Sequence, residues 1–159
     1  MPLTKFQPSS DKTPRYTIKE VSEMLELSPY TIRYYDSVGL IPSLCRTDKK
    51  IRLFSGYTIS WLRLVHCLRM TGLSIDGVKH YIDLCLQGDD TIPERAELIF
   101  QQEAILREQI RVLKKQMEVL KYKKKYYQEL LRSSRRDRCN PVNLMQQEPN
   151  IVCGDDYDS

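Results

Sequence analysis

The chain has 159 residues, of which 41% are hydrophobic and 29% charged, and its net charge is +4 at pH 7. This composition is typical of a globular protein with long charged helices and excludes a disordered polymer. No apolar run approaches the ~20 residues of a membrane span, the N-terminus lacks a signal sequence, and the five cysteines contain no CxxC pair. We therefore expect a soluble, cytoplasmic protein with no membrane partner.

The first predicted elements follow a short polar arm. Residues 1–14 contain three prolines and are predicted to be disordered. Thr17 and Glu20 have the spacing of a capping box, which predicts a first helix to about residue 25. Ser28 and Pro29 are typical of the start of a second helix, which Gly39 is placed to end. Two short helices joined by a tight turn predict a helix-turn-helix motif.

A basic hairpin and two further helices are predicted to complete a domain over residues 15–86. Extended structure is favoured on both sides of the turn "TDKK", and this hairpin carries four cations, Arg46, Lys49, Lys50 and Arg52. Capping serines predict helices over about residues 56–71 and 75–86. The basic excess of this part of the chain fits an anionic partner.

The second helix carries an unusual set of side chains in "PYTIRYY". Ile32 and Tyr35 are predicted to face inward, which turns Tyr30, Arg33 and Tyr34 toward solvent. Arg offers a fork of donors suited to guanine or phosphate, and Tyr hydroxyls suit phosphate oxygens. One interpretation is a DNA-reading helix. The other is that the three tyrosines cover a core and that Arg33 is merely solvated.

A long helix is predicted over residues 91–131, after the linker "QGDD". Thr91 and Glu94 have capping-box spacing. Apolar residues then recur at alternating steps of four and three, the heptad pattern of a coiled coil, with Lys124 in one seam position. Such a stripe cannot be buried on so small a domain, so a homodimer is expected. The predicted dimerisation residues are Leu106, Ile110, Leu113, Met117, Leu120 and Tyr127. Residues 132–159 lack periodicity and predict a disordered tail.

The order of these parts resembles that of the MerR-family transcriptional regulators. "YTIKEVSEMLELSPYTIRYYDSVGLIP" is similar to the family's N-terminal signature, "RTDKKIRLFS" to its wing, and "LRMTGLSIDGVKHY" to its second helix pair. The resemblance covers about residues 15–131. It implies a mainly α fold, in which a winged helix-turn-helix domain is followed by a long dimerisation helix that forms an antiparallel coiled coil.

The same resemblance implies a function. A homodimer grips double-stranded promoter DNA at a pseudo-palindrome and distorts the spacer, so that RNA polymerase, an indirect partner, can engage. Two positions depart from the family pattern: Lys50 stands where many members have Gly, and residues 56–58 lack the acidic side chains that often follow the wing. The implied DNA contacts are Thr17, Lys19, Tyr30, Thr31, Arg33, Tyr34, Arg46, Lys49 and Arg52.

A sensor site is sought among the cysteines. No tight Cys or His cluster is present, so neither a metal site nor a cofactor is predicted. "VHCLRMTGLSIDGVKHYIDLCLQGDDTIPERAEL" is similar to the family branch that answers aldehydes and other thiol-reactive electrophiles, and Cys67 falls on that branch's single cysteine. His66 and Arg69 are expected to favour its thiolate. The rival interpretation is a buried core cysteine. The weaker or incidental thiols are Cys45, Cys85, Cys139 and Cys153.

An enzyme is not predicted, because the sequence shows no Gly-rich phosphate loop, metal-ligand cluster or acid–base pair. The alternative to a DNA-binding regulator is a coiled-coil interaction module whose small head binds protein. The two hypotheses differ in their expected affinity for promoter DNA and in its salt dependence.

Overall fold

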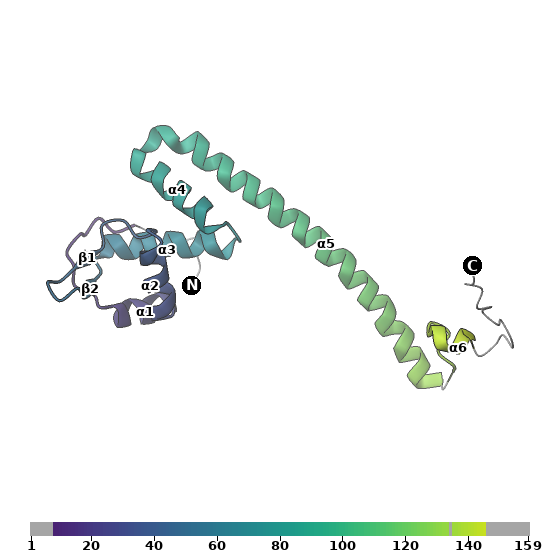
Figure 1. The fold of residues 1–159 in the computed structure, drawn as a ribbon. Helices are drawn as coiled ribbons and strands as arrows, with labels where there is room; N and C mark the ends of the chain where they lie inside the picture. The colour runs from purple at the N-terminus through teal and green to yellow at the C-terminus, as the bar shows by residue number, and fades with distance from the viewer. Residues whose placement is uncertain (1–7, 134, 146–159) are drawn as a thin grey trace, which may run out of the picture. The chain divides into compact units, whose positions relative to one another are not determined.

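The fold is known from a computed structural model that describes residues 8–133 and 135–145, with side chains as far as residue 143 (Figure 1). The chain forms two units, Met1–Glu108 and Gln109–Ser159, and the boundary falls inside the longest helix. Helices make up most of the described chain, and the sheet has two strands. The predicted mainly α fold is therefore confirmed.

The helix-turn-helix is built by α1 (Ile18–Leu25) and α2 (Pro29–Ser37). The predicted capping box of α1 is present: Glu20 N donates to Thr17 Oγ1 at 3.4 Å, and Thr17 N donates to Glu20 Oε2 at 2.7 Å. The Glu20 carboxylate accepts from both Thr17 N and Thr17 Oγ1, and these two bonds favour its charged form and lower the pKa of Glu20. Ser28 caps α2 by accepting from Thr31 N at 3.0 Å. Gly39, in the left-handed region at φ +76°, follows the end of α2.

The wing is the antiparallel pair β1 (Cys45–Arg46) and β2 (Arg52–Leu53), in which Cys45 lies opposite Leu53. Its turn is the predicted one, closed by a bond from Lys50 N to Thr47 O at 2.7 Å. An isolated bridge between Tyr16 and Phe54 ties the start of the domain to the base of the wing.

Two longer helices complete the first unit's hydrophobic core, α3 (Gly56–Met70) and α4 (Ile75–Gln87). Ser55 and Ser74 cap them, as predicted from the sequence. All buried apolar side chains of the described chain lie between Val21 and Leu84. The largest fully buried ones are Phe54, Ile32, Leu40 and Leu62, so the core is shared by both helix pairs and the base of the wing.

Residues 8–14, which the sequence predicts to be a disordered arm, bond to the first turns of α3. Ser9 N donates to Ser60 Oγ at 2.9 Å, and Asp11 O accepts from Tyr57 N at 2.8 Å. The first amides of a helix need acceptors from outside it, and the arm supplies one. Gly56 makes room, because a Cβ there would lie 2.6 Å from Ser9 Oγ. Residues 1–7 lie outside the described part of the chain.

The long helix α5 (Ile92–Ser133) begins after the 3₁₀ turn η2 (Asp89–Thr91). The predicted capping box at its start is wrong. The Thr91 hydroxyl donates to carbonyls at the end of α4, at 2.8 Å from Leu84 O and 2.7 Å from Gly88 O. Those carbonyls lack partners within α4, and the backbone at Gly88 brings Thr91 over them.

Every residue of α5, all of which the structure describes, is exposed or half-buried. The predicted seam residues are 38–62% exposed: Leu106, Ile110, Leu113, Met117, Leu120 and Tyr127. A stripe of large apolar side chains so exposed needs a partner surface.

Residues 135–145, which belong to the tail that the sequence predicts to be disordered, bond to the flank of α5. Asp137 Oδ1 accepts from Tyr126 Oη at 2.7 Å and from Cys139 N at 2.8 Å, and the short helix α6 (Pro141–Met145) follows. The cause is local, because Tyr126 presents a hydroxyl on the flank of α5 that fixes the returning chain. Cys153 and the rest of residues 146–159 lie outside the described part.

No helix in the described residues is long and apolar enough to cross a membrane.

Candidate DNA interface

The outward face of α2 is formed by Tyr30, Arg33 and Tyr34. Arg33 and Tyr34 follow Tyr30 by three and four residues, so all three lie on one side of the helix. Tyr30 is 77% exposed, Tyr34 is 41% exposed and Arg33 is exposed, whereas Ile32 and Tyr35 are buried. Of the three tyrosines, only Tyr35 therefore serves the core. The exposed side chains offer a guanidinium fork and two phenol hydroxyls, donors that suit base edges and phosphate oxygens.

The threonine hydroxyls at the helix starts beside this face are engaged in local hydrogen bonds. Thr17 Oγ1 donates to Glu20 Oε2 at 2.8 Å, and Thr31 Oγ1 lies 2.8 Å from Ser28 Oγ. These hydroxyls first serve as caps, while the exposed Lys19 side chain on the first turn of α1 is a cation open to solvent. Thr17 and Thr31 are thus weaker candidate contacts than their positions in the motif suggest.

The wing is held to α2 by a carboxylate that the sequence analysis missed. Asp36 Oδ2 accepts from Arg46 Nη2 at 2.6 Å and from Arg52 Nε at 2.6 Å. The side chain of Asp36 is 8% exposed, whereas that of Arg46 is 43% exposed. One buried carboxylate therefore orients both wing arginines, which leaves the remaining donors of each fork available. The sequence signal that could have identified Asp36 was an acidic residue inside an otherwise basic surface.

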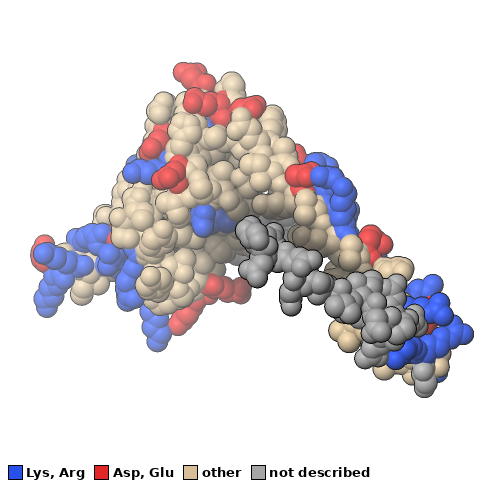
Figure 2. Space-filling model, turned by 45° about the vertical axis from the view of Figure 1, so that its right-hand side comes forward, with Lys and Arg blue, Asp and Glu red and all other residues tan. Residues whose placement is uncertain are grey.

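The tip of the wing carries Lys49 and Lys50, both exposed. Lys50 has φ +59°, in the left-handed region that favours glycine. Lys50, at the position where many family members have Gly, therefore keeps the turn conformation at the cost of some backbone strain. It also adds a cation at the tip. Figure 2 shows Lys and Arg gathered over the wing end of the first unit, with acidic side chains over the turn between α4 and α5.

Cys67 is half-buried on α3, and burial raises the pKa of its thiol. Arg69, which was expected to favour the thiolate, instead donates to Leu73 O in the turn between α3 and α4 and lies beside the Tyr35 hydroxyl. Arg69 therefore does not act as the activating cation that was expected for this thiol. Cys85 accepts from a cation, with its Sγ 3.5 Å from Arg95 Nη1.

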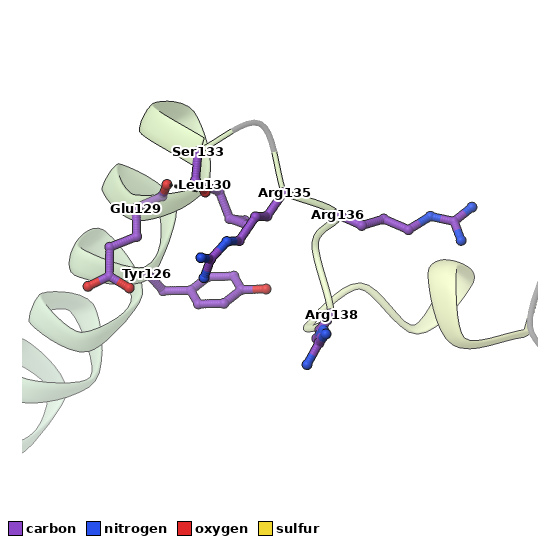
Figure 3. Close-up of a pocket in the computed structure, with 7 residues that line it drawn as sticks. All are labelled: Tyr126, Glu129, Leu130, Ser133, Arg135, Arg136 and Arg138. Carbon is purple, nitrogen blue, oxygen red and sulfur yellow. Dashed lines mark hydrogen bonds between the residues drawn. The ribbon is translucent and has the colours of Figure 1, made fainter.

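No group of three or more His, Cys, Asp or Glu among the described residues is arranged to hold a metal ion. The second unit contains a pocket of about 480 Å³ where the chain turns back after α5 (Figure 3). The bond to Asp137 that forms this turn raises the pKa of Tyr126 to about 12 and lowers that of Asp137. The pocket is lined by Tyr126, Glu129, Leu130, Ser133, Arg135, Arg136 and Arg138, so its walls mix both signs of charge.

Comparisons with known proteins agree with this geometry. Residues 16–85 match the family described as MerR HTH family regulatory protein. An uncharacterised HTH-type transcriptional regulator of Haemophilus influenzae is 37% identical over 114 residues, which cover 72% of this chain and 84% of that protein. The HTH-type transcriptional regulator AdhR of Bacillus subtilis is 35% identical over 91 residues, which cover 57% of this chain and 65% of AdhR.

Solved structures give the same result. HiNmlR, a MerR family regulator lacking the sensor domain and bound to promoter DNA, is 36% identical with a TM-score of 0.62. That match covers 72% of this chain and 87% of HiNmlR. A protein from Listeria monocytogenes described as a MerR family transcriptional regulator is 31% identical with a TM-score of 0.65, and the match covers 84% of this chain and 100% of that one.

Proposed function

Because the chain belongs to the MerR family of DNA-binding transcriptional regulators, we propose that it acts as a homodimer on a pseudo-palindromic promoter. Each winged head binds one half-site, and the pair distorts the spacer between them. The DNA distortion, rather than direct recruitment, is what lets RNA polymerase engage, so the polymerase is an indirect partner. Such a protein works where the promoter is, in the cytoplasm.

The observation that carries this proposal is the solvent-facing set of Tyr30, Arg33 and Tyr34 on α2. Aromatic side chains so exposed serve no core, and a cation among them suits an anionic partner. We assign Arg33 to base or phosphate contact, Tyr30 and Tyr34 to phosphate contact, and Arg46, Lys49 and Arg52 to the backbone beside the wing. Thr17, Lys19 and Thr31 complete the proposed contact set. HiNmlR, a 36% identical relative, is itself bound to promoter DNA.

The proposed dimer rests on α5, which buries none of its side chains within its own chain. A second α5 would cover the seam of Leu106, Ile110, Leu113, Met117 and Leu120 as an antiparallel coiled coil. The interaction-module alternative shares this seam, but it leaves the exposed face of α2 without a role and fits the relatives less well.

Electrophile sensing through Cys67 is a secondary proposal. It is supported by the partial exposure of the thiol on α3, which leaves it within reach of a small molecule. The raised pKa opposes it, because the thiolate is the reactive species.

The test begins with selection of a binding site from a pool of randomised duplex DNA by the full chain. Arg33→Ala is then compared with Lys79→Ala, which removes an exposed cation on α4 outside the proposed contacts. Loss of a bidentate base contact costs about 1–3 kcal/mol per half-site, so Arg33→Ala should weaken binding at least about tenfold. Lys79→Ala should stay within about threefold. Selection of no site, or equal affinity for both variants, would contradict the recognition-helix assignment.

A further inference from the structure

One flank of α5 in the second unit carries a row of cations beside the proposed seam. Its positions are 111, 114, 118, 121, 125, 128 and 132, which alternate in steps of three and four and so lie on one face of the helix. Five of these seven positions are cationic, and we call these five the cationic stripe: Arg111, Lys114, Lys121, Lys125 and Arg132. All five are exposed. The other two positions hold Glu118, which bonds to Lys121 at 2.8 Å, and Gln128.

The opposite flank of the seam has a different character. Positions 109, 112, 116, 119, 123, 126 and 130 repeat with the same steps and hold Gln, Val, Gln, Val, Lys, Tyr and Leu. This flank has one charge, and its last two members, Tyr126 and Leu130, are half-buried. The returning chain bonds to Tyr126, and the five side chains of the cationic stripe are exposed. The cations are therefore concentrated on one side rather than spread around the helix.

An antiparallel dimer would concentrate the cations of both copies on one face. In an antiparallel pair, the two-fold axis is perpendicular to the plane of the two helices, so both copies show the same flank on the same broad face. The two cationic stripes then share one face, and the two opposite flanks share the other. A parallel pair would instead place one flank of each kind on both faces.

The register of the pair sets how the stripes are offset. An antiparallel pair centred between Met117 and Leu120 has Leu106 opposite the partner's Leu131 and Leu113 opposite the partner's Lys124. The ten cations of the two stripes then extend over about 40 Å at a rise of 1.5 Å per residue. That length corresponds to about twelve base pairs of duplex DNA.

We propose that this cationic face binds the phosphate backbone of double-stranded DNA, as a contact separate from the winged heads. The inference rests on the antiparallel dimer of the proposed function. DNA is the partner that the charge favours, because between residues 109 and 133 the helix holds eight Lys or Arg against two Glu. An extended row of exposed cations matches a linear polyanion and offers no base-reading geometry, so the contact adds affinity without sequence preference.

The test compares two double variants of the full chain. Lys114→Gln with Lys125→Gln removes two stripe cations, and Lys115→Gln with Lys123→Gln removes two cations of the same helix off the stripe. Binding to a mixed-sequence 40-base-pair duplex is measured at several salt concentrations, and the dimer is checked by sedimentation. Each lost phosphate contact lowers the slope of log affinity against log salt by about 0.9. A dimer of the stripe double variant lacks four cations, so the slope should fall by about 2 to 4 and binding at ~0.1 M salt should weaken at least about tenfold. The control should stay within about threefold.

Two results would overturn the inference. Equal behaviour of the two double variants means that the stripe has no special role, and if the parent chain still binds DNA as a dimer, the proposed function stands without it. Loss of binding to poly-L-glutamate in the stripe variant, with unchanged binding to duplex DNA, means that the face is directed at acidic protein. A parent chain that is monomeric, or that does not bind DNA, fails both the proposed function and this inference.

Discussion

The head formed by α1 to α4 and the helix α5 solve the problem of apolar surface in opposite ways. The head buries Phe54, Leu62 and the other core side chains within one chain, whereas α5 leaves every seam residue at least 38% exposed. Both segments carry regular apolar patterns, so the pattern alone does not say what it packs against. The difference teaches that the head is a complete folding unit, while the pattern of α5 describes a surface for a second copy.

The largest effect that this comparison predicts is in the head. Phe54→Ala removes a fully buried ring and should destabilise the fold by about 3–5 kcal/mol, independently of protein concentration. Urea unfolding at two concentrations measures this. Ile51→Ala, at a side chain that is 55% exposed on the neighbouring wing, should cost less than about 1 kcal/mol. A strong concentration dependence of the Phe54 effect would mean that the head does not fold independently.

The next effect is in α5, where adjacent residues provide a matched pair. Leu120 lies on the seam and Val119 on the flank opposite the cationic stripe, yet both are 62% exposed in the single chain. Leu120→Lys should raise the dimer dissociation constant about 100-fold, because two ammonium groups would enter the seam. Val119→Lys should leave it within about threefold. Analytical ultracentrifugation measures both constants, and equal dissociation constants would remove the seam assignment.

A smaller effect is expected in the wing, which is the part of the head that has almost no core. Asp36→Asn removes the carboxylate shared by Arg46 and Arg52 and should cost about 1–2 kcal/mol, a value reduced by the exposure of Arg46. Amide exchange of residues 45–53 should speed up, while that of α3 and α4 should not change. Asp48→Asn, at an exposed position of the same wing, is the control. Identical exchange in the two variants would show that the wing is held by its backbone pairing alone.

The smallest effect is expected at Cys67, which lies at the edge of the core of the head. Because burial raises the pKa of Cys67, its thiolate fraction at pH 7 is below that of an ordinary thiol and grows only as the pH rises toward that raised value. Alkylation by iodoacetamide at pH 7 should be slower at Cys67 than at the exposed Cys45 and Cys139, by about tenfold, with little change in stability. Peptide mass spectrometry gives each rate. Faster reaction at Cys67 would reveal an activated thiol and favour the sensor proposal.

Local signals in the sequence predicted most of the fold. Ser28, Ser55 and Ser74 each identified a helix start, because a capping hydroxyl acts on amides two or three residues away. The exposed side of α2 was predictable for the same reason, since helical periodicity separates Ile32 and Tyr35 from Tyr30 and Arg33.

The contacts that the sequence did not predict have a partner that is distant in sequence or that depends on the path of the chain through a turn. Ser9 bonds to Ser60, fifty-one residues away, and Asp36 bonds to Arg52 across the wing. Thr91 had the spacing of a cap but serves carbonyls at the end of the preceding helix. Residue spacing carries no information on such contacts, because the tertiary fold brings the atoms together.

The shared carboxylate of Asp36 has a consequence for how this surface varies among related proteins. One oxygen atom accepts from both Arg46 and Arg52, so loss of Asp36 leaves two guanidinium groups without their shared counter-ion, and loss of both arginines leaves a nearly buried carboxylate unpaired. We expect the three positions to be inherited together, with compensating changes when one is lost. Lys49 and Lys50, which have no such tie, should drift independently.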